Sequence, residues 1–343
     1  MAKFVLHNKL STVEVDQTGA AIVSFALNQR QLNPLSFRLP RTSDPEAAHF
    51  QGHFICLPRW GDPTPGEQKK GLLKHGDISL LDWSFLQHSA LFLEARVTSA
   101  AEEMSVKRWM FLDEEQPVLQ VTEQIKNISS FIRMVNVVQH PTIAAPFLDD
   151  QVIVNCNGSK GFTNLLEKVD QLPFTNWPHA RLSENSGCDL QRSDQDCSGV
   201  FSYTIHDEDE FGWITAYSPK HNLLIGYIWK KNDYPWINCW VHAEAGSVIY
   251  RGLEFGTTGI HQSVDAINAS GHTKLFNEST LFMLDAGEQK SFAYTGFLLE
   301  PDPGFRGMES VRIGREGIIW KAVEESNEHL IKTPLTAYYG MEE

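Results

Sequence analysis

Short runs of aromatic and β-branched residues recur along the whole chain, and turn-forming residues separate them. Clear examples are residues 20–27, 90–98, 106–112, 118–126, 200–205, 211–217, 222–230, 247–256 and 291–298. Within 118–126, Leu119 and Val121 alternate with Gln120 and Thr122. Strands favour these residue types, and alternation with a period of two is typical of a sheet with one face against a core. The pattern therefore predicts an all-β chain of packed antiparallel sheets.

Helical periodicity is scarce, and its clearest instance is GIIWKAVEESNEHL at residues 317–330. We expect a short helical extension there, near the C-terminus. The segments 58–77 and 155–199 are rich in turn residues and unusually long for loops in a compact domain, which favours a functional role for them. No linker or internal repeat divides the sequence, so we predict a single domain over residues 1–343.

The composition is that of an ordinary globular protein, with 42% hydrophobic and 21% charged residues in a chain of 343. Acidic residues outnumber basic ones by 43 to 29, and the net charge of −14 repels nucleic-acid phosphates and anionic lipid headgroups. No apolar run approaches the roughly 20 residues of a membrane span. The first residues lack the apolar core of a signal peptide. We therefore expect a cytoplasmic protein with neither nucleic-acid nor membrane partners; its oligomeric state is left open.

The five cysteines, at positions 56, 156, 188, 197 and 239, are widely spaced and form no CxxC pair. An odd number at such spacings indicates neither a disulfide framework nor a zinc site. We expect reduced thiols, as is usual in the cytoplasm. Cys188 and Cys197 flank a polar segment and could pair, but the sequence gives this pairing little weight.

The motifs GxGxxG, GxxxxGK[ST], GxSxG and HExxH are all missing, so the usual signatures of nucleotide-binding folds, serine hydrolases and zinc proteases are not found. Two histidines have distinctive contexts instead. His75 precedes Gly76 in KHGD, and a glycine permits another group to approach the backbone closely. His140 precedes Pro141, where we expect a strand to end and open into a loop. A turn histidine and a hydrogen-bonded core histidine are the structural alternatives.

Glu254 interrupts the otherwise apolar or small run YRGLEFGTTG. In a strand, Leu253 and Phe255 would share one face and Glu254 would lie on the other with Gly252. Burying an unpaired carboxylate costs roughly several kcal/mol, so a glutamate in this position is rarely placed for packing. Arg251 would point to the opposite face and could not pair with it. The alternative is an exposed glutamate on a surface strand.

Aromatic and basic residues occur near these candidates in the sequence. Trp60, Trp83, Trp236 and Trp240 offer flat faces that suit the C–H faces of sugar rings, although each could equally be a core residue. Arg59, in LPRWGDP, carries a planar fork of donors that suits hydroxyls or a carboxylate, with a surface ion pair as the alternative.

Four ordered segments resemble the galactose mutarotase-like, or aldose 1-epimerase-like, superfamily, as a divergent subgroup. The segments are GHFICLPRWGDP (52–63), KHGD (74–77), VVQHPTIAAPF (137–147) and WINCWVHAEAGSVIYRGLEFGTTG (236–259). The resemblance covers roughly residues 15–300. It implies a β-supersandwich of large twisted antiparallel sheets, with a carbohydrate cleft on one concave face and no cofactor or metal.

The resemblance also implies roles for individual residues in interconverting the anomers of a small sugar. Glu254 would be the general base and His140 the general acid, on opposite sides of the sugar ring. His75 would help to hold the ring oxygen. Arg59 would grip the sugar, and Trp60 and Trp236 are further candidates for substrate binding. Asp233, in KKNDYPW, is the candidate for the sugar-binding aspartate of the family, while HPTIAAPF departs from the asparagine-rich version of the better-known branch.

Three other functions stay open. The same fold could hold a carbohydrate-binding protein without catalysis. A metal-dependent β-sandwich or cupin-like enzyme could use His53, His75, His140 and Glu254 as ligands, although the chain has no closely spaced HxH pair. A polysaccharide lyase is disfavoured by the net charge of −14, because lyases of acidic glycans usually carry basic clefts.

Overall fold

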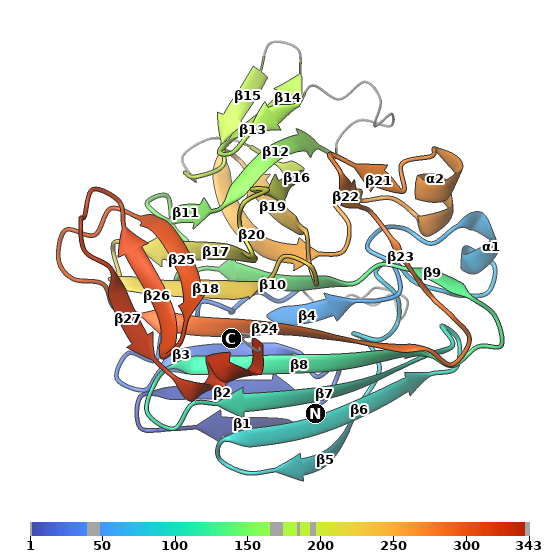
Figure 1. Ribbon diagram of the computed structural model, residues 1–343, viewed down its shortest axis with the longest axis horizontal. Helices are drawn as coiled ribbons and strands as arrows, with labels where there is room; N and C mark the ends of the chain where they lie inside the picture. Colours follow the sequence, from blue (N-terminus) through green and yellow to red (C-terminus); the bar gives the residue numbers. More distant parts are fainter. Residues whose placement is uncertain (1, 40–48, 165–173, 184–185, 193–196, 340–343) are drawn as a thin grey trace.

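The computed structural model describes residues 2–39, 49–164, 174–183, 186–192 and 197–339, and two large antiparallel sheets dominate it (Figure 1). The ten-stranded sheet has the order β1 (Lys3–His7), β2 (Ser11–Asp16), β3 (Ile22–Leu27), β4 (His53–Cys56), β10 (Val138–Ala144), β20 (Ser247–Gly256), β19 (Trp236–Glu244), β16 (Gly199–Ile205), β12 (Gly158–Thr163) and β13 (Thr175–Asn176). The eight-stranded sheet has the order β11 (Ile153–Cys156), β17 (Phe211–Ser218), β18 (Leu223–Lys230), β24 (Gln289–Leu299), β8 (Val118–Asn127), β7 (Met104–Leu112), β6 (Phe92–Ser99) and β5 (Ser84–His88). The all-β prediction and each of the strand runs cited from the sequence are confirmed.

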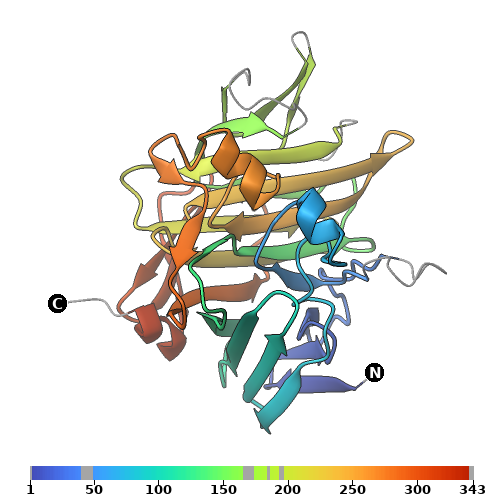
Figure 2. The ribbon, with the colours of Figure 1, turned by 90° about the vertical axis from the view of Figure 1, so that its right-hand side faces the viewer.

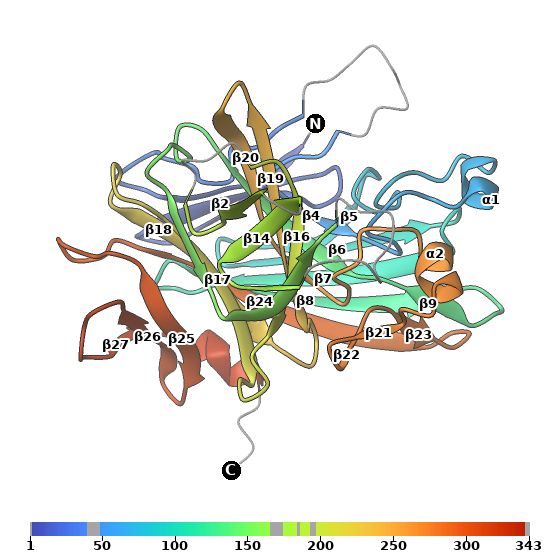
Figure 3. The ribbon, with the colours of Figure 1, turned by 90° about the horizontal axis from the view of Figure 1, so that it is seen from above.

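Smaller elements complete the described chain. They are the sheet of β25 (Met308–Gly314), β26 (Gly317–Ala322) and β27 (His329–Lys332), and the pairs β14 (His179–Ser183) with β15 (Ser186–Asp189), β21 (Lys274–Leu275) with β22 (Glu278–Ser279), and β9 (Arg133–Val135) with β23 (Phe282–Leu284). Two short α-helices, α1 (Pro65–Gln68) and α2 (Val264–Ala269), lie at the same end of the ten-stranded sheet (Figure 2 and Figure 3). Among the described residues, no helix has the length and apolar character needed to cross a membrane.

The main core lies between the two large sheets, and strand periodicity decides which side chains enter it. In β20, Leu253 and Phe255 belong to this core, and Phe255 stacks on Trp229 of β18 at 4.1 Å between ring centroids. Glu254 therefore points to the other face of the ten-stranded sheet, as its place in the sequence predicts. One core thus joins both sheets, and the single domain over residues 1–343 stays a prediction.

A buried polar network crosses the core and connects the sheets. Gln139 of β10 donates through Nε2 to the carboxylate of Glu123 in β8 at 2.6 Å. Its Oε1 accepts a hydrogen bond from Nε2 of His53 in β4 at 3.2 Å. Arg108 of β7 pairs with Glu123 through its Nε at 2.7 Å and donates to the carbonyl of Ala20 at 2.7 Å. Gln139 directly precedes His140, so this network ties the backbone that carries the histidine to the opposite sheet.

The predicted helix over 317–330 is wrong, because this segment forms β26, a turn and β27. Ile318, Trp320 and Ala322 alternate into a second apolar cluster, which packs the three-stranded sheet against the outer face of the eight-stranded sheet. Glu324 has a φ of +66°, a left-handed conformation that a helix interior does not contain. The last described element is a 3₁₀-helix, Pro334–Tyr339.

Two further expectations need correction. β10 does not end at Pro141 but continues to Ala144; Pro141 pairs with His53 of β4, and its missing N–H coincides with a break in the β10–β20 register at residues 140–141. The loop-rich segment 155–199 contains all or part of six strands, while its residues 165–173, 184–185 and 193–196 lie outside the described structure.

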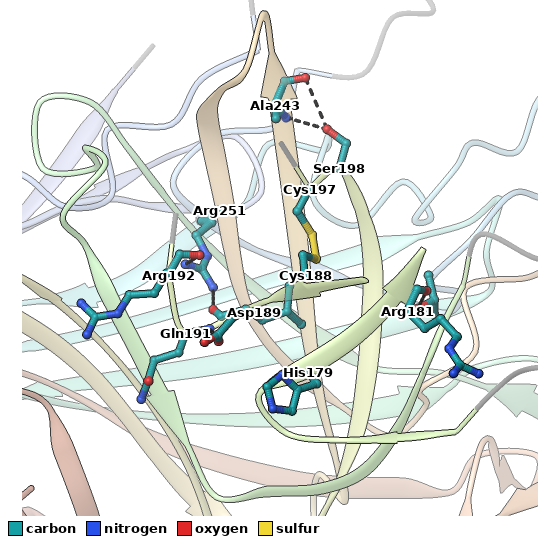
Figure 4. The surroundings of a disulfide bond; sticks show 12 residues. His179, Arg181, Cys188, Asp189, Gln191, Arg192, Cys197, Ser198, Ala243 and Arg251 are labelled. Atoms are coloured by element: carbon teal, nitrogen blue, oxygen red, sulfur yellow. Dashed lines mark hydrogen bonds between the residues drawn. A yellow bond between two sulfur atoms is a disulfide. The ribbon is translucent and has the colours of Figure 1, made fainter. Parts of the chain in front are cut away.

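Cys188 and Cys197 are joined by a disulfide bond (Figure 4), so the expectation of five free thiols is wrong. Cys56, Cys156 and Cys239 are free and buried. Arg251 of β20 donates to the carbonyl oxygens of Leu190 and Arg192, close to the disulfide. This contact confirms that Arg251 points away from the face that carries Glu254.

The inter-sheet network generates a test of stability. Glu123→Ala should lower the free energy of unfolding by about 3–5 kcal/mol, because it leaves the buried charge of Arg108 without its partner. Urea unfolding followed by circular dichroism measures the change. Glu328→Ala breaks an exposed pair with Arg312 and is the matched control, with an expected loss under about 1 kcal/mol. Equal losses in the two variants would show that the network does not bear on stability.

Candidate active site

A pocket of about 320 Å³ opens on the face of the ten-stranded sheet that points away from the core between the sheets. Its walls are mostly aromatic, with a small number of polar groups at one place. The lining residues are Phe37, Leu39, Phe50, Phe54, Trp60, Lys74, His75, His140, Val200, Trp240, Glu254 and His261. A concave, mainly apolar cavity with a few convergent polar groups is the usual form of a small-molecule site.

Strand register brings His140 and Glu254 together. β10 pairs with β20 so that Val138 lies opposite Gly256 and Thr142 lies opposite Gly252. This register puts His140 level with Glu254 on the neighbouring strand, and both side chains point into the pocket. His140 Nε2 lies 3.2 Å from Glu254 Oε1, although the alignment is too poor for a regular hydrogen bond.

Each member of this pair is oriented by neighbours. Trp60 Nε1 donates to Glu254 Oε2 at 2.9 Å. His140 Nδ1 lies 2.9 Å from the hydroxyl of Thr142, and Phe54 stacks on the imidazole with 4.4 Å between ring centroids. A threonine hydroxyl can donate or accept, so it is compatible with either tautomer of the neutral imidazole. Nε2 of the histidine can therefore donate to the carboxyl group or accept from it.

Gly252 makes room for the carboxyl group. A Cβ atom at this position would lie 2.6 Å from Glu254 Oε1 and 3.1 Å from the Cβ of Trp240. The side chain of Glu254 therefore leans over the glycine, along its own strand and toward Trp240. Any larger residue at position 252 would force the carboxyl group out of its present place.

The segment 58–77, predicted to be a functional loop, supplies one wall of the pocket through Trp60, Lys74 and His75. Its fold depends on Arg59, which donates to both carboxylate oxygens of Glu102 at 2.6 and 2.7 Å and to Glu67 at 2.8 Å. His75 has a φ of +62° and its Nδ1 is buried without a hydrogen bond. The left-handed backbone turns this imidazole into the pocket.

His261 is the functional candidate that the sequence reasoning missed. It follows β20 and lies 4.9 Å from Trp60 and 5.7 Å from His75 between ring centroids. Gly61 and Gln262 are in close contact, since a Cβ on the glycine would lie 2.7 Å from the backbone of Gln262. The loops after β4 and β20 thus meet, and the GTTG sequence that ends β20 was the only signal that a wall of the site begins there.

Burial shifts the proton affinities of these groups in opposite directions. Burial lowers the pKa of His140 to about 3 and that of His261 to about 4, and holds the pKa of His75 well below 6.5. Burial also raises the pKa of Glu254 well above 4.5, against the opposing effect of the hydrogen bond from Trp60. Burial therefore disfavours the imidazolium form of each histidine and the carboxylate form of Glu254.

Three residues expected to bind substrate lie outside the pocket. Arg59 is buried in its ion pairs with Glu102 and Glu67. Trp236 packs in a separate apolar cluster and donates to the carbonyl of Ser279 at 2.7 Å. Asp233 follows β18 and lines a different cavity, of about 180 Å³, together with Lys290.

One of the four proposed metal ligands lies apart from the other three. His53 points into the core between the sheets, where its ring lies 5.0 Å from that of Tyr294. His75, His140 and Glu254 do line one pocket. Within the part of the chain that the structure describes, no group of three His, Cys, Asp or Glu side chains has an arrangement that could hold a metal ion.

Comparison with solved structures identifies the fold. A galactose mutarotase-like protein from Lactobacillus casei superposes with a TM-score of 0.62 at 15% identity, over 87% of this chain and 100% of the other. A galactose mutarotase-like protein from Clostridium acetobutylicum gives 0.61 at 14%, over 87% and 95%. A galactose mutarotase related enzyme from Lactobacillus acidophilus gives 0.60 at 13%, over 87% and 97%. The resemblance seen in the sequence is therefore confirmed at the level of the fold, which is the galactose mutarotase-like sandwich.

Comparisons of sequence find no such relationship. No family model matches the chain, and no curated protein matches it. The low identities agree with the interpretation of a divergent subgroup.

The burial of the imidazoles generates a test of the site. His140 should remain neutral at pH 5, well below the ordinary histidine pKa of about 6.5. Long-range ¹H–¹⁵N NMR spectra report the charge state of each ring, and His140→Asn identifies the signal. His140 takes up a proton near pH 6.5 in the unfolded chain but only near pH 3 in the folded protein. This histidine therefore lowers the free energy of unfolding as the pH falls from about 6.5 toward 3. Titration of its ring near pH 6.5 would show that the pocket is fully hydrated.

Proposed function

We propose that this chain is an isomerase of the aldose 1-epimerase, or mutarotase, type, which interconverts the anomers of a free sugar or sugar derivative in the pocket of Glu254 and His140. The contact of 3.2 Å between the carboxyl group and the imidazole carries the proposal. The fold shared with galactose mutarotase-like proteins supports it. The size of the pocket, at the lower end of the usual range for small ligands, agrees with a single sugar ring.

The chemistry needs one proton to be given and one to be taken. The ring oxygen O5 accepts a proton while the C1 hydroxyl loses one, the C1–O5 bond breaks, and C1 becomes an aldehyde carbon. Rotation about C1–C2 presents the other face, and the two proton transfers run in reverse as the ring closes. No electrons are gained or lost, so the reaction requires only a positioned acid and a positioned base.

The Glu254–His140 pair holds one exchangeable proton, which this cycle uses and returns. Burial favours the state in which this proton is on Glu254 and His140 is neutral. From that state Glu254 donates to O5 while His140 accepts from the C1 hydroxyl, and ring closure returns both protons. Glu254 would then begin as the acid and His140 as the base, the reverse of the roles that the resemblance implies.

The geometry of the attack differs from the sequence-based expectation. Glu254 and His140 project side by side from neighbouring strands and do not face each other across a ring. Because O1 and O5 are bonded to the same carbon, an adjacent pair can reach both oxygens from one edge of the sugar. The sugar would then lie over the sheet with this edge on the pair and its other hydroxyls toward the loops.

Other residues would bind and orient the sugar. His75 and His261 present neutral imidazoles, which can donate to or accept from hydroxyls, and Trp60 holds the carboxyl group. Arg59 is a positioning residue that fixes the loop, and we no longer assign a sugar contact to Arg59, Trp236 or Asp233. A small sugar as the only partner remains part of the proposal. A cytoplasmic location stays a prediction, and the Cys188–Cys197 disulfide would persist more readily in an oxidising compartment.

Removing either member of the pair should abolish catalysis. Glu254→Gln and His140→Asn are each expected to lower the enzymatic rate of anomer interconversion by about 10²–10⁴-fold. Saturation-transfer NMR or polarimetry on freshly dissolved α-D-glucose and α-D-galactose measures the rate above that of buffer. Glu14→Gln, which alters an exposed glutamate in β2, is the matched control and should retain the full rate. A protein that binds sugar and gives no rate enhancement would instead be a carbohydrate-binding protein without catalysis.

The pH profile should lack an acid limb near the ordinary histidine pKa. The pair keeps a single proton above about pH 4, because the pKa of His140 is about 3, and loses it as Glu254 ionises at a pH well above the ordinary glutamate pKa of about 4.5. Trp60→Phe removes the hydrogen bond that favours the ionised carboxylate, so it should move the limb that follows Glu254 ionisation to higher pH. The enzymatic increment in kcat/KM across the pH range measures both. A shift to lower pH in this variant would contradict the assigned role of the tryptophan.

A further inference from the structure

A row of aromatic side chains continues from the pocket along β19 and β20. In their register, Trp240 lies opposite Gly252 and His242 lies opposite Tyr250. All of these positions share the parity of Glu254 and therefore project from the same face of the sheet. Trp240 belongs to the pocket wall, with its ring 5.8 Å from that of His140, whereas His242 and Tyr250 lie beyond it. We call the surface formed by Trp240, His242 and Tyr250 the aromatic platform.

The rings of the aromatic platform are nearly parallel. The planes of Trp240 and Tyr250 differ by 28°, those of Trp240 and His242 by 26°, and those of His242 and Tyr250 by 12°, with centroids 5.7–6.1 Å apart. Phe37 packs edgewise against Tyr250 at 4.9 Å and holds this arrangement from one side. All three rings are only partly buried, and 39% of the His242 side chain is exposed. The three pairs are stacked, so the rings partly cover one another and leave an apolar surface with polar atoms at its edges.

The aromatic platform is continuous with the site of chemistry. Gly252, which has no side chain, separates Glu254 from Tyr250 along β20, and the carboxyl group of Glu254 lies over it. The carboxyl group leans over this glycine toward Trp240, so the reactive end of the pocket faces the aromatic platform. A ligand too long for a pocket of about 320 Å³ can extend in this direction without displacing a side chain of either strand.

We propose that the aromatic platform is a second sugar subsite, so that the natural ligand is a reducing disaccharide or longer oligosaccharide with its reducing-end ring in the pocket. This inference rests on the proposed function. Because the reducing-end ring must keep C1 free, the second ring is attached through one of its other hydroxyls. The C–H face of that ring would lie on the three aromatic rings, and the ring nitrogens and phenol hydroxyl at their edges would meet its hydroxyls.

The charges at the aromatic platform favour a neutral sugar over a phosphate group. His242 Nε2 lies 3.1 Å from the carboxylate of Glu244, which repels an anion at this edge. The cation of the pocket wall, Lys74, is 45% exposed and lies 3.7 Å from the carboxylate of Asp62, which offsets its charge. The net charge of −14 acts in the same direction.

Comparing one-ring and two-ring sugars tests the inference. The probes are glucose and galactose against maltose, cellobiose and lactose, with the ratio of kcat/KM for disaccharide to monosaccharide as the readout. At least one disaccharide should exceed its monosaccharide by about tenfold, the factor that corresponds to 1.4 kcal/mol of binding. Tyr250→Ala should reduce this ratio toward one. His242→Ala, which changes a more exposed residue, is the second variant if Tyr250→Ala does not fold.

A control and a direct binding measurement separate the possible results. Phe111→Ala removes a comparably exposed aromatic residue from β7 of the other sheet and should leave the ratio as it is. Saturation-transfer-difference NMR should show contacts from protons of both sugar rings in the wild type and from fewer second-ring protons in Tyr250→Ala. Contacts from both rings without any rate enhancement would overturn the proposed function and retain the subsite. Ratios near one for all three disaccharides, with no second-ring contacts, would overturn the subsite and leave the aromatic rings as cross-strand pairs that stabilise the hairpin.

Discussion

The register between β10 and β20 is the constraint on which the site depends. With Val138 opposite Gly256, His140 is level with Glu254, and a slip of one residue would turn one of the two side chains into the core. The opposite faces of the same strands hold this register, because Phe255 packs on Trp229 and Gln139 bonds to Glu123 across the core. The packing that stabilises the sandwich is thus also what places an acid next to a base.

Burial gives the pair its chemical character. In water a glutamate and a histidine at neutral pH would hold different charges, whereas in this pocket desolvation disfavours the charged form of each. Burial therefore favours the form of the pair with the proton on Glu254 and a neutral His140. Phe54 and Trp240 exclude water from the histidine, while Trp60 directs the carboxyl group. Aromatic side chains consequently set both the solvation and the orientation of the pair.

The remaining walls depend on contacts made far from the pocket. Arg59 and Glu102 form a buried pair in which each side chain is 2% exposed or less, and this pair fixes the loop that carries Trp60 and His75. Such a pair is a weak source of stability, because desolvation offsets much of the attraction, yet it restricts the loop to one geometry. The arginine seen in the sequence beside the candidate site is therefore buried in this pair and does not line the pocket.

The alternation of residue types was sufficient to predict an all-β chain of packed antiparallel sheets, nine of the strands in the two large sheets and the face on which Glu254 lies. Four short segments, compared with a known family, were sufficient to single out Glu254, His140, His75 and Trp60, which the structure brings into one pocket. Periodicity reports only which face a side chain takes. It was ambiguous over 317–330, because the nearly continuous apolar run at the start of this segment fits the period of a strand as well as that of a helix.

Only the tertiary structure decided which of these side chains meet. His140 and Glu254 are 114 residues apart in sequence, and nothing in either segment specifies their register. The same applies to the inward turn of Arg59 toward Glu102, the hydrogen bond of Trp236 to Ser279 and the arrival of His261 beside Trp60. Local sequence determines the conformation and the exposed face of each strand, whereas the neighbours across a sheet are set by packing between segments that the chain brings together from a distance.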